Sequence, residues 1–191
     1  MRDAPMGDRK RVGILISGRG SNMRALIEQA SGYEVVLVAS NKPQAPGLDC
    51  ARAAEIPTWT WASKGVPRGQ FETALSRALH DYGVGTVALA GYMRLLSPAF
   101  VEEWQGRIVN IHPSLLPKYP GLDTHARALA ARDTVSGCSV HIVTDAVDAG
   151  EVIAQAEVPI EPGDDVHLLE KRVLKAEHAL YPAALAEFVK R

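Results

Sequence analysis

Asn110 and His112 are the residues of this chain whose types and spacing best suit catalysis. Ile108, Val109 and Ile111 around them are strand formers, and residues two apart in extended backbone point to the same face. An amide there can hold a developing oxyanion, and an imidazole can move a proton near neutral pH. A structural alternative also fits, in which the asparagine satisfies a turn and the histidine packs on the sheet. The pair is therefore a candidate site that needs support from the rest of the chain.

An acidic segment, residues 145–151, offers a partner for this histidine because it holds Asp145, Asp148 and Glu151 around Ala149 and Gly150. A carboxylate next to His112 would favour the protonated imidazole and suit it for acid–base work near pH 7. Asp and Gly are also ordinary hairpin-turn residues, so plain turn chemistry is an alternative. A Ca²⁺ loop is a weaker alternative, because the spacing does not match an EF-hand.

A glycine-rich turn at residues 18–22 follows the apolar run at residues 12–16 and precedes a helical pattern. That layout places backbone N–H groups and the positive end of a helix around a phosphate, and Ser21 is expected to cap the helix. The turn lacks the Gly-Lys-Ser/Thr of a triphosphate loop, and Met23 stands where the dinucleotide fingerprint has glycine. The pattern favours a single phosphate on a small substrate. A tight turn without a ligand is the alternative.

Other polar residues give weaker signals. His141 lies in the middle of an expected strand and is interpreted as a packed or supporting histidine. Helix surfaces are the expected place for the remaining candidates, which are His80, His125, His167, Glu177 and His178. No two histidines and a carboxylate fall at a familiar metal spacing, so we expect no metal. The two cysteines are interpreted as small buried hydrophobes.

The expected elements predict an α/β fold. Apolar runs at residues 12–16, 34–39, 56–60, 86–90 and 108–112 alternate with helical patterns, which is typical of parallel strands. Strands at residues 138–144 and 152–160 are too close for a crossover helix and should be antiparallel. A long helix after Asp165 should be kinked or interrupted by Pro182. We predict a Rossmann-like, open, twisted and mostly parallel sheet with helices on both faces, an antiparallel C-terminal strand pair and a long C-terminal helix.

Composition limits the function classes. With 191 residues, 47% of them hydrophobic, the chain fits one domain at residues 11–191 after a flexible extension at residues 1–10. A net charge of −1 gives no electrostatic footprint for nucleic acid or a membrane surface. No apolar run approaches the roughly 20 residues that span a bilayer, and the first residues do not resemble a signal peptide. The expected location is the cytoplasm.

Four runs of sequence resemble one enzyme family when they are taken together in this order. They are Ile16-Ser-Gly-Arg-Gly-Ser-Asn22, Leu89-Ala-Gly-Tyr-Met-Arg-Leu-Leu-Ser-Pro-Ala-Phe100, Asn110-Ile-His-Pro-Ser-Leu-Leu-Pro-Lys-Tyr-Pro-Gly121 and Ser139-Val-His-Ile-Val-Thr-Asp-Ala-Val-Asp148. The third run with a later Asp resembles the folate-dependent formyltransferases. The first run, joined to a second strand that ends in asparagine, resembles the phosphoribosylglycinamide formyltransferases within that family.

The resemblance implies formyl transfer from 10-formyltetrahydrofolate to the amine of glycinamide ribonucleotide, without a covalent enzyme intermediate. It implies that Asn110 stabilises the oxyanion, that His112 is the general acid and that Asp148 keeps this histidine protonated. It also implies that Glu177 reaches the substrate. The substrate phosphate would be held by Gly20, Ser21 and Asn22. The folate would be contacted by Arg68, Met93, Arg94, Leu95, Leu96 and Asn110.

Some positions depart from the family pattern, and several functions are left open. Asp123 and Ser136 stand where the family usually has histidine, and Ala149 where it usually has glycine. Alternatives in the same class are a formyltetrahydrofolate deformylase, which uses water as acceptor, and a methionyl-tRNA formyltransferase. An alternative outside the class is a non-catalytic module that binds a sugar phosphate. The resemblance leaves open whether the protein is a monomer or a homodimer.

Overall fold

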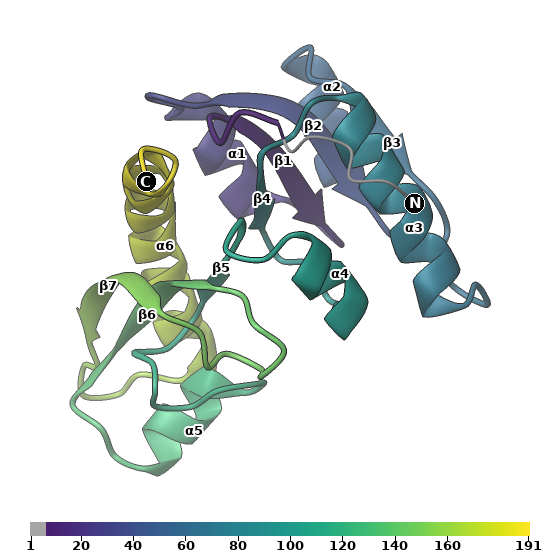
Figure 1. Ribbon diagram of the computed structural model, residues 1–191. Helices are drawn as coiled ribbons and strands as arrows, with labels where there is room; N and C mark the ends of the chain where they lie inside the picture. The colour runs from purple at the N-terminus through teal and green to yellow at the C-terminus, as the bar shows by residue number, and fades with distance from the viewer. Residues whose placement is uncertain (1–6) are drawn as a thin grey trace.

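The computed structural model describes residues 7–191, which form a single seven-stranded sheet covered by helices (Figure 1). The strand order is β3-β2-β1-β4-β5-β6-β7. The first five strands in the chain pair in parallel, whereas β6 pairs antiparallel with both β5 and β7. The strands are β1 (Arg11–Ile16), β2 (Glu34–Ser40), β3 (Thr58–Thr60), β4 (Thr86–Leu89), β5 (Ile108–His112), β6 (Val135–Ile142) and β7 (Val152–Pro159).

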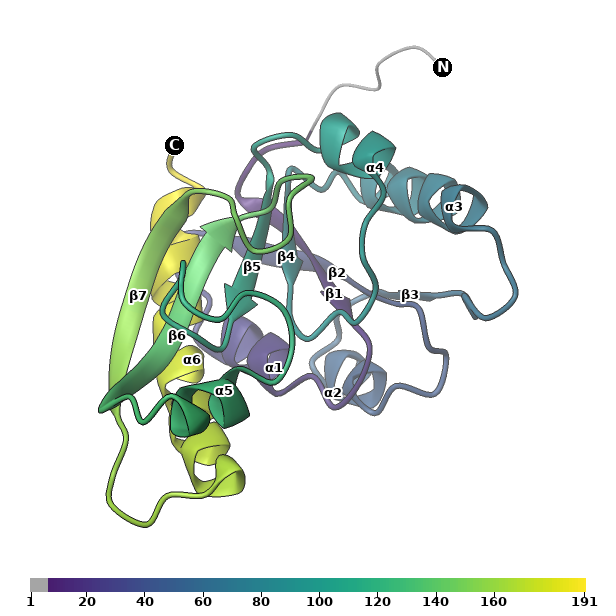
Figure 2. The ribbon, with the colours of Figure 1, turned by 90° about the horizontal axis from the view of Figure 1, so that it is seen from below.

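Helices cover both faces of the sheet, as the sequence predicted (Figure 2). One apolar core lies between the sheet and α1, α2 and α6, and a second lies between the sheet and α3 and α4. The helices are α1 (Ser21–Glu28), α2 (Gly47–Ala53), α3 (Arg68–Asp81), α4 (Pro98–Glu103), α5 (Thr124–Ala130) and α6 (Val166–Phe188). The predicted mostly parallel α/β fold with an antiparallel end and a long C-terminal helix is confirmed.

Strand β1 shows why these apolar runs become central strands. Ile14 and Ile16 enter one core and Leu15 enters the other, so both faces of the strand are buried. Gly13 belongs to the second face, where a Cβ atom would lie 2.7 Å from Cδ2 of Leu79. The missing side chain therefore lets α3 approach the sheet closely.

One local expectation was wrong, and the interruption expected as one of two effects of Pro182 was wrong as well. Ser21 does not cap α1, because the cap position is Gly20, whose left-handed φ of 71° turns the chain into the helix without a side-chain hydrogen bond. Pro182 does not interrupt α6, which runs through it to Phe188. Pro182 cannot donate to the carbonyl of His178, and Nε2 of Gln29 donates to that oxygen instead, at 3.1 Å.

Several histidines and cysteines also differ from the expectations. His80 and His125 are half-buried and not on the surface, and His80 stacks on Trp104 with ring centroids 5.0 Å apart. Cys138 is buried, which raises the pKa of its thiol to about 12, whereas Cys50 is only half-buried. Within residues 7–191, no helix has the length and apolar character to cross a bilayer.

The expected extension at residues 1–10 lies partly outside the described residues. Its last four residues, 7–10, are hydrogen-bonded to the sheet. Thr86 donates to the carbonyl of Arg9 at 2.7 Å, and Arg107 donates to the carbonyl of Gly7 at 3.1 Å. Residues 7–10 are therefore held against the amino ends of β4 and β5, just before β1 begins.

Candidate active site

His112 ends β5 with its side chain buried among polar groups. Only 5% of the residue is exposed, because the loop at residues 113–121 folds over it. The Nδ1 atom lies 3.3 Å from Oδ2 of Asp148, and Nε2 donates to the backbone carbonyl of Tyr119 at 2.9 Å. Both ring nitrogens therefore face an oxygen that can accept a hydrogen bond.

Asp148 reaches this histidine from the loop between β6 and β7. Its backbone has a φ of 50°, and its Oδ2 atom accepts from the amide of Gly121 at 2.8 Å. Burial opposes ionisation of this carboxyl. The His141 and Gly121 donors and the nearby His112 outweigh that effect, so the pKa of Asp148 lies below its ordinary value. The structure thus brings Asp148 to His112 as an anion.

His141 joins Asn110 to the same carboxylate. It pairs with Asn110 across the antiparallel β5–β6 ladder and is 2% exposed. Its Nε2 atom lies 3.2 Å from Nδ2 of Asn110 and 3.5 Å from Oδ1 of Asp148. Of the two roles that the sequence left for this histidine, the structure shows the supporting one. Its place between the two groups depends on strand pairing, which sequence spacing alone does not give.

The glycine-rich turn lies between β1 and α1, as expected for a phosphate loop. Gly20 and Ser21 are half-buried, and Asn22 is buried in the first turn of α1. The Nδ2 atom of Asn22 donates to Oε2 of Glu177 at 2.6 Å, while its buried Oδ1 atom has no partner in the described part of the chain. This oxygen can only accept, so it fits a ligand group that donates a hydrogen bond, such as a hydroxyl or an amine.

Glu177 projects from α6 into this turn and is 6% exposed, so its default placement on the surface was wrong. Burial raises the pKa of its carboxyl, although the hydrogen bond from Asn22 acts in the opposite direction. The sequence signal that could have found it is its position four residues before Tyr181, which is fully buried on the same helix.

A buried serine connects the phosphate turn with the segment at residues 93–96. The hydroxyl of Ser17 donates to Oδ1 of Asn41 at 2.6 Å and accepts from the backbone N–H of Met93 at 2.9 Å. The carboxyl ends of β1, β2 and β4 are thereby joined at one edge of the sheet. This is the edge where open α/β sheets bind ligands.

The residues expected to contact folate differ in their exposure and in their contacts. Met93 and Leu95 are 67% and 64% exposed, as apolar side chains at an open binding surface would be. Arg94 instead packs on α3, with its guanidinium 5.1 Å from the ring centroid of Phe71. Arg68 is exposed at the first residue of α3, one helical turn before that phenylalanine.

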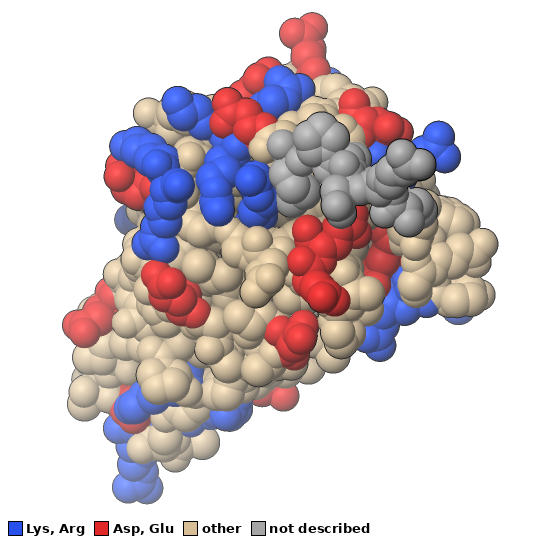
Figure 3. Space-filling model, viewed as in Figure 1, with Lys and Arg blue, Asp and Glu red and all other residues tan. Residues whose placement is uncertain are grey.

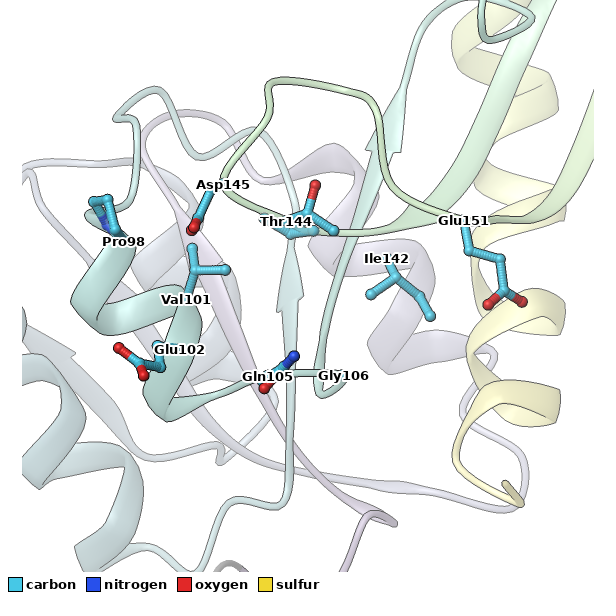
Figure 4. Close-up of a pocket in the computed structure, with 10 residues that line it drawn as sticks. Pro98, Val101, Glu102, Gln105, Gly106, Ile142, Thr144, Asp145 and Glu151 are labelled. Carbon is cyan, nitrogen blue, oxygen red and sulfur yellow. The ribbon is translucent and has the colours of Figure 1, made fainter.

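A cavity of about 650 Å³ lies between α4 and the start of the loop at residues 143–151 (Figure 4). Its wall combines apolar side chains with three carboxylates and includes Val101, Glu102, Ile142, Val143, Asp145 and Glu151. His112 does not line it. The sequence pointed to one side of this cavity through the acidic segment, but it did not reveal α4 as the opposite wall. Val101 and Glu102 lie beyond the run at residues 89–100 and carry no motif, so only the packing of α4 brings them to the cavity.

Charged side chains of both signs lie on the surface. Figure 3 shows basic and acidic side chains side by side on one face of the molecule, consistent with a net charge of −1. Among residues 7–191, no group of three His, Cys, Asp or Glu side chains could hold a metal ion.

Comparison with known proteins connects this geometry to one family. A family model described as formyl transferase matches residues 10–185. The phosphoribosylglycinamide formyltransferase of Escherichia coli (strain K12) is 47% identical over 180 residues, which cover 92% of this chain and 85% of that protein. The crystal structure of phosphoribosylglycinamide formyltransferase from Brucella melitensis superposes with a TM-score of 0.89 at 47% identity, covering 98% of this chain and 97% of that chain.

Longer relatives contain a similar segment. The trifunctional purine biosynthetic protein adenosine-3 of Drosophila pseudoobscura pseudoobscura is 50% identical over 185 residues, which are 93% of this chain but only 14% of that protein. The similarity therefore concerns one part of the trifunctional relative. A family match over most of the chain, together with 47% identity to a relative of which this chain covers 85%, shows that this chain belongs to the formyl transferase family.

Proposed function

We propose that this protein transfers the formyl group of 10-formyltetrahydrofolate to the amine of 5'-phosphoribosylglycinamide. The products are phosphoribosyl-N-formylglycinamide and tetrahydrofolate, and the step belongs to purine biosynthesis. The observation that carries the proposal is the meeting of Asn110, His112 and Asp148 at the carboxyl end of β5, in a chain of the formyl transferase family. The phosphate-type turn follows β1, which lies two strands away from β5 in the same sheet.

The chemistry is a direct transfer. The substrate amine attacks the formyl carbon and forms a tetrahedral intermediate. Its oxyanion accepts hydrogen bonds from the Asn110 amide and from Nε2–H of the protonated His112 ring, which turns to it from the carbonyl of Tyr119. The bond between the formyl carbon and the folate nitrogen then breaks. The folate nitrogen gains a proton and the attacking nitrogen loses one, so the proton count balances. Asp148 keeps the ring protonated, and His141 holds Asn110 and Asp148 in place.

Two sets of residues hold the substrates in this proposal. Gly20, Ser21 and Asn22 bind the phosphate through the turn before α1, and Glu177 accepts hydrogen bonds from the glycinamide ribonucleotide. The folate lies along the exposed apolar segment at residues 93–96 and extends toward the cavity beside α4. Its remaining contacts come from Arg68 and Asn110.

One assay separates this proposal from its rivals. The protein is incubated with 10-formyltetrahydrofolate, with and without glycinamide ribonucleotide, and the release of tetrahydrofolate is followed. Release that depends on the amine supports the transferase. Release without the amine would indicate a deformylase, and no release would indicate a binding module.

The same assay tests the assignment of the general acid. Loss of an oxyanion donor costs about 10²–10³ in rate, so His112→Ala should lose at least that much in kcat while remaining folded by circular dichroism. Turnover near that of the unchanged protein would refute the role of His112. A location in the cytoplasm belongs to the same proposal. A monomer and a homodimer both fit it, and sedimentation equilibrium distinguishes them.

A further inference from the structure

We propose that Asp133 is a positioning residue for this reaction, because it anchors Tyr119 and thereby fixes the carbonyl that orients His112. The inference rests on the proposed function, since it assumes that His112 acts on the substrate. Asp133 lies just beyond α5 and touches neither ring nitrogen of that histidine.

The loop at residues 118–121 holds both members of the His112–Asp148 pair through its backbone. The carbonyl of Tyr119 accepts from Nε2 of His112 at 2.9 Å. Two residues later, the amide of Gly121 donates to Oδ2 of Asp148 at 2.8 Å. A shift of this short segment would therefore move the imidazole and the carboxylate relative to each other.

The backbone alone does not hold this segment in place. Tyr119 has a φ of 55°, in the left-handed region that residues other than glycine seldom adopt. Such a conformation persists when surrounding contacts enforce it. The necessary contacts must come from outside the segment, since Pro117 and Pro120 provide no backbone N–H. The buried hydroxyl of Ser114 donates to the carbonyl of Lys118 at 2.6 Å and lies 3.3 Å from that of Tyr119.

Asp133 holds the side chains of the same two residues, Lys118 and Tyr119. Its Oδ2 atom accepts from the hydroxyl of Tyr119 at 2.8 Å and from Nζ of Lys118 at 3.0 Å. These hydrogen bonds, that from Lys118 first, lower the pKa of the Asp133 carboxyl, so it is an anionic acceptor at neutral pH. On the same segment, Arg127 donates to the carbonyl of Pro120 at 2.6 Å and lies 5.2 Å from the ring centroid of Tyr119.

Lys118 and Tyr119 both donate to the Asp133 carboxylate, but only Tyr119 contacts His112. The Lys118 side chain is 61% exposed, so its ion pair is screened and worth little. Tyr119 is half-buried, and its own carbonyl contacts the imidazole. The anchor therefore acts through the tyrosine.

The experiment compares Asp133→Ala, Tyr119→Phe and the double variant, with Lys118→Gln as the matched control that removes the other partner of the carboxylate. The kcat and both KM values are measured with 10-formyltetrahydrofolate and glycinamide ribonucleotide between pH 5 and pH 10. The titratable groups that face His112 are Asp148, His125 of α5 and, through Asp148, His141; none of the variants changes them.

Asp133→Ala and Tyr119→Phe should each lower kcat roughly tenfold, because misplacement of a reacting group is costly, while the KM for glycinamide ribonucleotide changes little. The alkaline limb of the kcat profile should move to lower pH in both variants, since a looser carbonyl stabilises the protonated ring less. The double variant should be no worse than either single variant, because both remove the same contact. Lys118→Gln should stay within about twofold of the unchanged protein.

Other results would overturn the inference. An unchanged pH profile in Tyr119→Phe would do so, because that variant removes one hydroxyl from a half-buried residue and leaves the fold intact. Effects of the two variants that multiply in the double variant, or a loss in Lys118→Gln as large as in Asp133→Ala, would also do so. If the unchanged protein shows no amine-dependent release of tetrahydrofolate, the proposed function itself has failed, and the two failures are thereby distinguished.

Discussion

Asp148 is the residue on which protonation of the proposed site depends. Its carboxylate lies 3.3 Å from Nδ1 of His112 and is 11% exposed. Asp148→Asn keeps the size of the side chain but removes the charge. We therefore expect kcat to fall at least about 10²-fold, with a smaller change in either KM, in steady-state kinetics near pH 7.

A control and a pH test accompany this prediction. Asp81→Asn removes an exposed carboxylate at the end of α3 and should leave kcat unchanged. The pKa of Asp148 is depressed in the folded protein, so its charge stabilises the fold above the unfolded pKa of about 3.9, and this contribution is lost as pH falls through the folded pKa. Acid unfolding of Asp148→Asn should accordingly depend less on pH, and an identical pH dependence would count against an ionised, paired Asp148.

The charge of Glu177 should lower the stability of the fold, whereas the charge of Asp148 raises it. Burial raises the pKa of this carboxyl, so the fold loses stability as pH rises from about 4.3 through the folded pKa. Glu177→Gln avoids that cost and still offers an oxygen to Asn22. We expect a higher melting temperature at pH 7 together with a higher KM for glycinamide ribonucleotide. Higher stability without a change in KM would remove Glu177 from the substrate site.

Among single residues, the sequence pointed to those that lie in motifs and missed those that contact and position the motif residues. Asn110 and His112 were found because they alternate with apolar residues at a strand end. The connection between two strands gave three candidate carboxylates, Asp145, Asp148 and Glu151, and the family resemblance chose Asp148 among them. Asp133 could not be found in this way. Its contact with Tyr119 depends on the path of a proline-rich loop, and no local periodicity encodes that path.

Among the elements, the strand ends are joined by Ser17, whose hydroxyl links β1, β2 and the segment at residues 93–96. Ser17→Ala leaves the amide of Met93 and Oδ1 of Asn41 without this partner in a buried place. We expect a loss of about 1–3 kcal/mol in the free energy of unfolding, measured by urea denaturation. The KM for 10-formyltetrahydrofolate should rise about threefold or more, because the segment proposed to bind folate is no longer fixed.

A neighbouring serine provides the matched control for that variant. Ser40 is also buried at a strand end, but its hydroxyl bonds only locally, to Lys42. Ser40→Ala should lower stability and leave the folate KM unchanged. Equal KM values in the two variants would show that Ser17 does not position the folate segment.

The element types were predictable because their signals are local. Continuous apolar runs such as residues 86–90 indicated buried parallel strands, and the short connection before Val152 indicated an antiparallel pair. The continuity of α6 through Pro182 was not predictable, since it depends on Gln29 from α1 satisfying the freed carbonyl of His178. The cavity wall on α4 was missed for the same reason, because distant segments create it.

In the whole molecule, α6 contacts two parts of the proposed site at the carboxyl edge of the sheet, the phosphate-type turn and the strand pair β4–β5. Glu177 and Tyr181 are four residues apart and therefore lie on one face of the helix. The first reaches the phosphate turn through Asn22. The second lies beneath the sheet, where its hydroxyl is 3.0 Å from the carbonyl of Leu89 in β4 and 3.1 Å from that of Val109 in β5. Leu89 pairs with Asn110, so this contact lies next to the proposed oxyanion donor.

Tyr181→Phe should therefore affect both stability and catalysis. The two carbonyls lose a fully buried donor, which should cost about 1–3 kcal/mol in urea denaturation. Because the hydroxyl no longer links the carbonyls of β4 and β5 beside Asn110, kcat should fall severalfold while the KM for glycinamide ribonucleotide stays unchanged. Tyr33→Phe is the matched control, since that buried hydroxyl donates to Leu26 in α1, away from the strands. It should cost stability alone, and equal kcat losses in the two variants would show that the hydroxyl of Tyr181 does not position the strand that carries Asn110.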